Sequence, residues 1–142
     1  MNMENIFSHK VSFGDTDAAG IVFYPNFYRW MDMASSDYIG NLYLPVSKLI
    51  RERGTFIPLL ETFCKFSNPL YFEDEFEVHS RVVEMGNKTI KFEHVFKRDD
   101  THIASGYEVR AWVHKIDGNK YKAIPIPDEV RAAFGFGELT KK

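Results

Sequence analysis

The sequence contains very little cysteine, since Cys64 is the only one among 142 residues. A lone thiol has no partner within its own chain, so an internal disulfide is excluded. Disulfide frameworks are typical of secreted proteins, whereas isolated thiols are typical of reducing compartments. We therefore expect a cytoplasmic protein in which Cys64 packs as a small buried side chain.

Long apolar runs and an excess of positive charge are also missing. Residues 1–10 include charged side chains, and no later run approaches the roughly 18 apolar residues that a membrane helix needs. The sequence therefore predicts no signal peptide and no membrane insertion. The formal net charge is −2, and nucleic-acid-binding domains usually carry a basic excess, so we expect no nucleic-acid partner.

Motifs of several other enzyme classes are absent. The sequence has neither a G-x-S-x-G nucleophile element nor a glycine-rich phosphate loop. Its five histidines, at positions 9, 79, 94, 102 and 114, do not show the spacing of metal ligands. We therefore expect an activity that uses neither a metal ion nor a cofactor.

The residues that are present predict one domain, spanning 1–142, which is long enough for a single core. Alternation over 7–13 predicts a half-buried strand. A helix is expected from Asn26 to about Gly40, because apolar residues recur there at helical spacing, namely Phe27, Trp30, Met31, Ala34 and Tyr38. We expect this stripe to face the core. A shorter helix is predicted for 45–53, with Gly54 as its stop.

The second half of the sequence predicts long antiparallel strands, over 56–66, 73–84, 89–97 and 103–113, and a short one over 121–124. In the run 103–113, Tyr107 and Val109 alternate with Glu108 and Arg110, which favours an apolar inner face and a charged outer face. The expected fold class is α+β, in which one principal helix packs on one curved antiparallel sheet.

Two carboxylates stand in a turn between the first strand and the principal helix, Asp15 and Asp17. An acid beside a helix start suggests chemistry, because the first turn of a helix offers unpaired N–H groups and a positive dipole end. The alternative is a loop in which aspartates only support turns. We expect Asp15 to accept backbone N–H bonds and hold the loop, and Asp17 to be the catalytic candidate.

The stretch 13–28 closely resembles the signature of the 4-hydroxybenzoyl-CoA thioesterase family of hotdog-fold proteins. The signature stands here as Phe13, Asp15-Thr16-Asp17-Ala18-Ala19-Gly20, Ile21-Val22-Phe23 and Tyr24-Pro25-Asn26-Phe27. Members of the family often have proline after the catalytic aspartate, where this chain has Ala18. The element order and the length also match, so the resemblance covers most of the chain.

The resemblance implies a hotdog fold, in which the sheet wraps the long helix, and a homodimer that often associates into a dimer of dimers, a homotetramer. It implies that the active site lies at the protomer interface, that Asp17 is the catalytic carboxylate, and that the backbone N–H near Tyr24 polarises the thioester carbonyl. It further implies that the hairpin of Asn87, Lys88 and Thr89 approaches the nucleotide end of coenzyme A. A solvated hairpin lysine is the alternative reading for Lys88.

The implied activity is hydrolysis of an acyl-CoA to a free acid and CoA. Asp17 would attack the carbonyl carbon as a nucleophile or activate water as a general base, and the sequence leaves both roles open. The acyl group is also left open, between an aromatic group such as benzoyl or hydroxybenzoyl and a short aliphatic chain. A non-catalytic acyl-CoA-binding hotdog protein is the alternative function.

Overall fold

The computed structural model describes residues 3–137. Its helices are α1 (Pro25–Leu42), α2 (Val46–Arg53) and α3 (Asp128–Ala133), and a 3-10 turn, η1, spans Phe13–Asp15. Its strands are β1 (Glu4–Lys10), β2 (Thr55–Phe56), β3 (Leu59–Phe66), β4 (Glu75–Met85), β5 (Thr89–Arg98), β6 (Thr101–Ala111), β7 (Val113–Asp117) and β8 (Lys120–Ala123). None of the helices within this range is long and apolar enough to cross a membrane.

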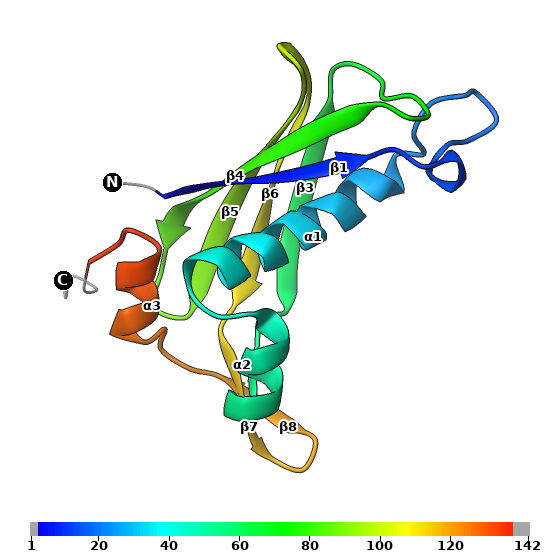
Figure 1. Cartoon of the computed structure of the whole chain (residues 1–142). Coiled ribbons are helices and arrows are strands. Elements are labelled where there is room, and N and C mark those ends of the chain that lie inside the picture. Colours follow the sequence, from blue (N-terminus) through cyan, green and yellow to red (C-terminus); the bar gives the residue numbers. More distant parts are fainter. Residues whose placement is uncertain (1–2, 138–142) are drawn as a thin grey trace.

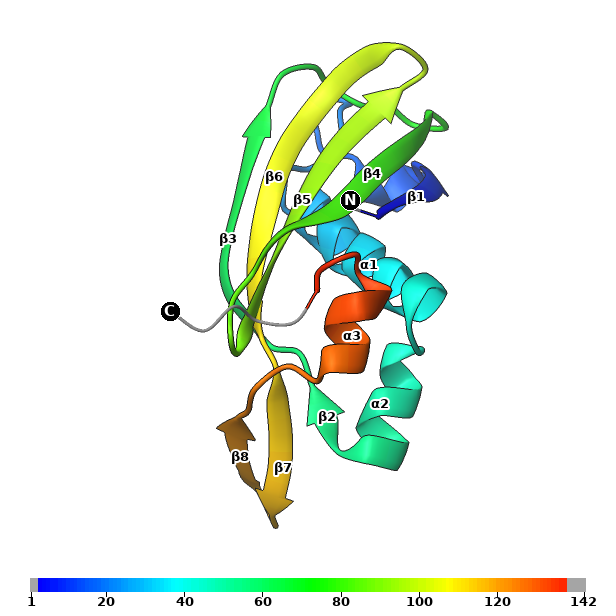
Figure 2. The same cartoon turned by 90° about the vertical axis from the view of Figure 1, so that its left-hand side faces the viewer.

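Five strands form a curved antiparallel sheet in the order β1-β4-β5-β6-β3, and α1 lies along its concave face (Figures 1 and 2). This arrangement confirms the predicted α+β class and the single principal helix. The predicted single sheet is incomplete, because β2, β7 and β8 form a second, three-stranded sheet that projects from one end of the first. Strand β3 lies at one edge of the main sheet, next to β6 alone.

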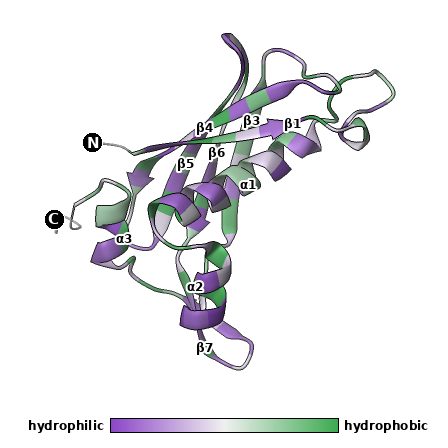
Figure 3. Cartoon of the chain, in the orientation of Figure 1, coloured by the Kyte–Doolittle hydropathy of each residue, from purple (hydrophilic) through white to green (hydrophobic). Residues whose placement is uncertain are grey.

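Helix α1 is held on the sheet by the apolar stripe that its sequence predicts. Its five members are all at most 4% exposed, and burying a large apolar side chain contributes about 1.5–3 kcal/mol. Gly106 of β6 allows a close approach of this helix, because a Cβ atom there would lie 2.7 Å from Met31 Sδ and would also meet the carbonyl oxygen of Phe63. Hydrophobic and hydrophilic residues alternate along β4, as expected for a strand with one buried face (Figure 3).

Most predicted elements are confirmed, with small changes at their ends. Gly54 ends α2 in the left-handed conformation, with φ of 60°, as its position predicts. Strand β1 ends at Lys10, so Phe13 belongs to the 3-10 turn and is 75% exposed. The predicted strand 56–66 is interrupted at Pro58, because proline has no N–H for the ladder.

The prediction for the two faces of β6 is wrong. Glu108 and Arg110 lie inside, whereas Tyr107 and Val109 lie on the outer, half-buried face. The cause is a β-bulge at Ile103: Phe96 pairs with Ala104 while the next residue of β5 pairs with His102, so one residue of β6 is unmatched. An extra residue reverses the alternation of all side chains that follow it.

Candidate active site

The acidic loop is a tight turn that returns to the start of α1. Asp17 opens the turn, since its N–H donates to the Ile21 carbonyl at 2.9 Å and its own carbonyl accepts from Gly20 N–H at 2.9 Å. Thr16 and Val22 pair across the turn as an antiparallel bridge. The turn thus places Asp17 a few residues before the first turn of α1, as the sequence predicts.

Asp15 supports this loop. Its carboxylate is buried and accepts hydrogen bonds from the Ser12 N–H at 2.9 Å and the Ser12 hydroxyl at 2.8 Å. Its carbonyl oxygen accepts from Phe23 N–H and from the Asn26 side-chain amide, both at 2.9 Å. These bonds fix the loop to the start of α1 and confirm the supporting role predicted for Asp15.

Asp17, in contrast, is exposed. One carboxylate oxygen, Oδ1, accepts a hydrogen bond from Ala19 N–H at 2.9 Å, which orients the side chain on the turn. The other oxygen, Oδ2, has no hydrogen-bond partner in the part of the chain that the structure describes. A carboxylate with one oxygen tethered and one open can act as a base or as a nucleophile on a bound molecule.

Tyr24 precedes the first residue of α1 and has an open backbone N–H. Phe23 N–H and Asn26 N–H both donate to backbone carbonyls, and Pro25 has no N–H. Within residues 3–137, no acceptor is found for the N–H of Tyr24. The donor therefore stands at the positive end of an 18-residue helix, where it can stabilise a developing negative charge on oxygen.

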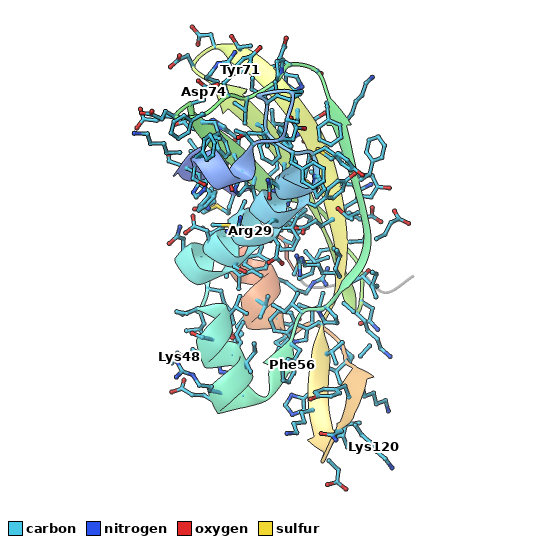
Figure 4. All side chains as sticks on the ribbon, turned by 90° about the vertical axis from the view of Figure 1, so that its right-hand side faces the viewer. Arg29, Lys48, Phe56, Tyr71, Asp74 and Lys120 are labelled. Carbon is cyan, nitrogen blue, oxygen red and sulfur yellow. The ribbon has the colours of Figure 1, made fainter. Side chains whose placement is uncertain are left out.

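An apolar pocket of about 410 Å³ lies beside Tyr24. We call it the acyl pocket, and its lining residues are Ile21, Val22, Tyr24, Phe27, Phe66, Ser67, Asn68, Pro69 and Leu70. Ile21 pairs with Tyr71, which Figure 4 labels at this end of the molecule. The volume is in the range of small-molecule sites, and the lining suits a ring or an alkyl chain.

The predicted nucleotide-binding hairpin is far from Asp17 within one chain. Lys10, a few residues before the acidic loop, pairs with Glu75 at one end of β4. Asn87, Lys88 and Thr89 lie beyond the other end of the same strand, eleven residues long. The turn is anchored there, since Ile126 N–H donates to the Asn87 carbonyl and Trp112 N–H to the Lys88 carbonyl, both at 2.9 Å.

A second hollow, of about 340 Å³, was not predicted from the sequence. We call it the α1–α2 groove, and its lining residues are Asp32, Ser35, Ser36, Ile39, Val46, Ile50, Phe56, Ile57, Pro58 and Arg110. Asp32 and Arg110 are the charged members of this lining. Phe56 marks the groove in Figure 4, toward the end of the molecule opposite Tyr71.

An array of buried polar side chains lies behind the groove, and it was not predicted from the sequence either. The Glu108 carboxylate contacts His94 Nε2 at 2.9 Å and Arg110 Nη2 at 2.7 Å, and it accepts a hydrogen bond from the Ser35 hydroxyl. His94 Nδ1 contacts the Ser80 hydroxyl at 2.7 Å. Burial alone raises the pKa of Glu108, but the hydrogen bonds from His94 and Arg110 outweigh it and lower this pKa to about 2. Glu108 is therefore ionised at neutral pH.

A weak signal for this array was present in the sequence. His94 shares a strand face with Phe92 and Phe96, and a histidine on an apolar face needs polar partners in the core. Its partners are Ser35, Ser80 and Glu108. The sequence pattern assigned Glu108 to the opposite face, because the bulge in β6 could not be predicted from the sequence.

Comparison with known proteins shows the family to which this chain belongs. The sequence pattern of the thioesterase-like superfamily matches residues 11–134. This chain belongs to that superfamily. This chain resembles the 4-hydroxybenzoyl-CoA thioesterase of Pseudomonas sp. (strain CBS-3), with 29% sequence identity over 83% of this chain and 88% of the relative. An acyl-CoA thioesterase of Haemophilus influenzae is 28% identical over 93% of this chain and 96% of its own.

Solved structures agree with the sequence comparison. A gentisyl-coenzyme A thioesterase has 41% sequence identity and a TM-score of 0.81, over 92% of this chain and 98% of its own. The Pseudomonas enzyme gives a TM-score of 0.84 at 26% identity, over 92% and 98% of the two chains. These neighbours confirm the hotdog fold and the thioesterase class that the stretch 13–28 predicts.

Proposed function

We propose that this thioesterase hydrolyses an aromatic acyl-CoA to the free acid and CoA. The observation that carries the proposal is the open N–H of Tyr24, a residue that follows the Asp17 turn in the chain and lines the apolar acyl pocket. The aromatic choice is supported by the relatives, because those named for hydroxybenzoyl-CoA and gentisyl-CoA both act on ring-bearing thioesters. An activity without metal or cofactor fits the residues that surround the pocket.

Tyr24 and Asp17 have different roles in the proposed hydrolysis. The thioester carbonyl oxygen accepts a hydrogen bond from the N–H of Tyr24, which stabilises the negative charge that forms on this oxygen. Asp17 either attacks the carbonyl carbon, so that CoA leaves as the thiolate and a mixed anhydride is hydrolysed by water, or removes a proton from the attacking water. Both routes give the free acid and the CoA thiol, and both need Asp17 ionised.

A homodimer formed through β3 is part of the proposal. Strand β3 is an edge strand of eight residues, and apolar side chains along it are exposed, namely Leu59, Leu60, Phe63 and Phe66. A long apolar edge with unpaired backbone groups is a template for pairing with another chain. A two-fold axis near Phe63 would extend the sheet across both protomers and pair the two β3 strands antiparallel.

Such pairing would join the acyl pocket of one protomer to the α1–α2 groove of the other. The acyl pocket includes Phe66, at the end of β3, and the α1–α2 groove includes Pro58, just before its start. In an antiparallel pair, the end of one β3 meets the start of the other. The acyl pocket of one protomer would then face the groove of its partner, and the site would be complete only in the dimer.

Two further assignments belong to the proposal. The Asn87-Lys88-Thr89 hairpin would bind the phosphates of a CoA molecule that another protomer holds, because the hairpin lies too far from Asp17 in its own chain. A dimer of dimers provides such a neighbour.

A cytoplasmic location is supported by the single, buried Cys64. Burial raises the pKa of the Cys64 thiol to about 11, so the thiol stays protonated and unreactive at neutral pH.

A thiol-release assay tests the proposed function. We expect hydrolysis of benzoyl-, hydroxybenzoyl- or phenylacetyl-CoA to be faster than that of short-chain acyl-CoAs, because the acyl pocket is mostly apolar and its volume of about 410 Å³ leaves room for a ring. Measurable CoA binding without release of thiol from any substrate would instead identify a non-catalytic acyl-CoA-binding protein. Faster release from the short-chain substrates would refute the aromatic assignment.

A further inference from the structure

The segment that connects β3 to β4 lies against the acidic turn. We call residues 67–74 the crossover segment. Its Tyr71 pairs with Ile21 as an antiparallel bridge, and the Ile21 carbonyl accepts the N–H of Asp17 at 2.9 Å. The crossover segment therefore supports the returning side of the turn that carries Asp17.

Arg98, the last residue of β5, ties the crossover segment together. Its Nη1 donates to the Pro69 carbonyl at 3.0 Å and to Asp74 Oδ2 at 2.9 Å. The same oxygen of Asp74 accepts the N–H of Tyr71 at 2.8 Å, and Figure 4 labels these two residues together at one end of the molecule. We call the ion pair the Arg98–Asp74 brace. One nitrogen of the brace thus joins the residues on both sides of Tyr71.

The backbone next to the brace is strained. Glu73, the neighbour of Asp74, has a φ of 69°, a left-handed conformation that is costly for a residue with a long side chain. Its N–H donates to the Val11 carbonyl at 3.0 Å, which helps to hold it there. Strain of this kind persists where surrounding contacts fix the backbone, and it is found preferentially near functional groups.

Stability alone does not account for the brace. The side chains of Arg98 and Asp74 are 27% and 24% exposed, and ion pairs with access to water contribute little to folding. Hydrogen bonds between charged groups do, however, fix the geometry of the backbone that they join. The backbone joined here is the part of the crossover segment that contacts the acidic turn.

The crossover segment also contributes four residues to the lining of the acyl pocket, but three of them are held by other contacts. Ser67 and Asn68 donate their N–H groups to the Ile103 carbonyl, at 2.8 and 3.0 Å, and the Leu70 side chain is fully buried in the core. These contacts hold most of this wall without the brace. Loss of the brace should therefore disturb the acidic turn more than the acyl pocket.

We propose that Arg98 and Asp74 are positioning residues for the catalytic step, because they fix the turn that carries Asp17. The inference rests on the proposed function, in which Asp17 acts on the thioester. The Asp17 side chain is exposed and is oriented by one bond to Ala19 N–H, so its position depends on the backbone of the turn. A displacement of about 1 Å at a catalytic group can lower a rate by as much as ~10².

The test is steady-state thiol release from 4-hydroxybenzoyl-CoA by Arg98→Met, which keeps an unbranched side chain but removes both hydrogen bonds. We expect kcat to fall about tenfold while KM stays within about twofold of the wild type, because the catalytic turn shifts and the pocket wall does not. The matched control is Arg81→Met, which breaks the solvent-exposed ion pair with Glu93 and should leave both constants unchanged.

Two more variants separate positioning from general support of the fold. Because one nitrogen of Arg98 makes both bonds, a single ammonium group can replace it, and Arg98→Lys should recover most of the lost kcat. Asp74→Asn keeps an acceptor for Tyr71 N–H but loses the charge, and we expect kcat to fall about threefold. This variant keeps the test decisive if Arg98→Met does not fold.

The melting temperature of each variant is measured in parallel. A folded Arg98→Met or Asp74→Asn enzyme with the wild-type kcat would overturn the positioning role and leave the proposed function intact. A raised KM at unchanged kcat would also overturn it, because the brace would then support only the pocket wall. A wild-type enzyme that releases no thiol from any aromatic acyl-CoA would overturn the proposed function and this inference with it.

Discussion

The buried carboxylate of Glu108 makes the stability of this protein depend on acid pH in a way that can be calculated. Its pKa falls from an ordinary value of 4.5 to about 2 in the folded protein, because His94 and Arg110 hydrogen-bond to its ionised form. A group with a lowered folded-state pKa stabilises the fold above its unfolded-state pKa and loses this contribution as pH falls toward the folded-state value. The stabilisation by Glu108 is therefore lost as the pH falls from 4.5 to about 2.

The size of the effect follows from the shift. A difference of about 2.5 pKa units corresponds to about 3 kcal/mol at neutral pH, which is lost at about 1.4 kcal/mol for each pH unit within the window. Glu108→Gln removes this titration. The wild-type advantage in free energy of unfolding should therefore be constant from pH 5 to 7 and shrink steadily from pH 4.5 to 3.

The assay is urea denaturation of the wild type and Glu108→Gln at half-unit steps from pH 3 to 7. The control is Glu93→Gln, on the outer face of β5, where the ion pair with Arg81 is solvent-exposed and should contribute less than about 1 kcal/mol at any pH. A wild-type advantage that stays the same from pH 7 to 3 would refute the ionised, hydrogen-bonded state of Glu108.

Three further outcomes are expected. Asp15→Ala removes the acceptor of two Ser12 hydrogen bonds and should lower the free energy of unfolding by about 1–2 kcal/mol, measured by thermal and urea denaturation. Lys88→Glu should raise KM for acyl-CoA several-fold with little change in kcat, and an unchanged KM would count against the hairpin. Phe63→Glu places like charges near the proposed two-fold axis, so light scattering should show monomers and turnover should be lost; an active monomer would contradict the interface site.

The sequence predicted the elements of this fold well, because most of them depend on local patterns. The α1 stripe, the stop at Gly54 and the alternation in β4 each follow from residues within the element itself. The supporting role of Asp15 in the loop was also predicted, since its capping contacts reach only three residues back, to Ser12.

Features that depend on long-range pairing were missed. The bulge at Ile103 arises from the register between β5 and β6, which periodicity within one strand does not reveal. One unmatched residue moved Glu108 and Arg110 from the predicted outer face into the core. The polar array around His94 and the groove beside Asp32 both depend on that reversal. Neither could therefore be predicted from the sequence pattern of one strand at a time.

The central claim is that Asp17 performs the chemistry on a thioester held by the Tyr24 N–H. The most direct test is steady-state thiol release from 4-hydroxybenzoyl-CoA by Asp17→Asn, with the melting temperature of the variant measured in parallel. Because Asp17 is exposed and its one bond to Ala19 N–H can be kept by an amide oxygen, the melting temperature should not change. Turnover should fall at least ~10²-fold, the range for loss of a catalytic acid or base. A folded variant with near-normal turnover would contradict the account.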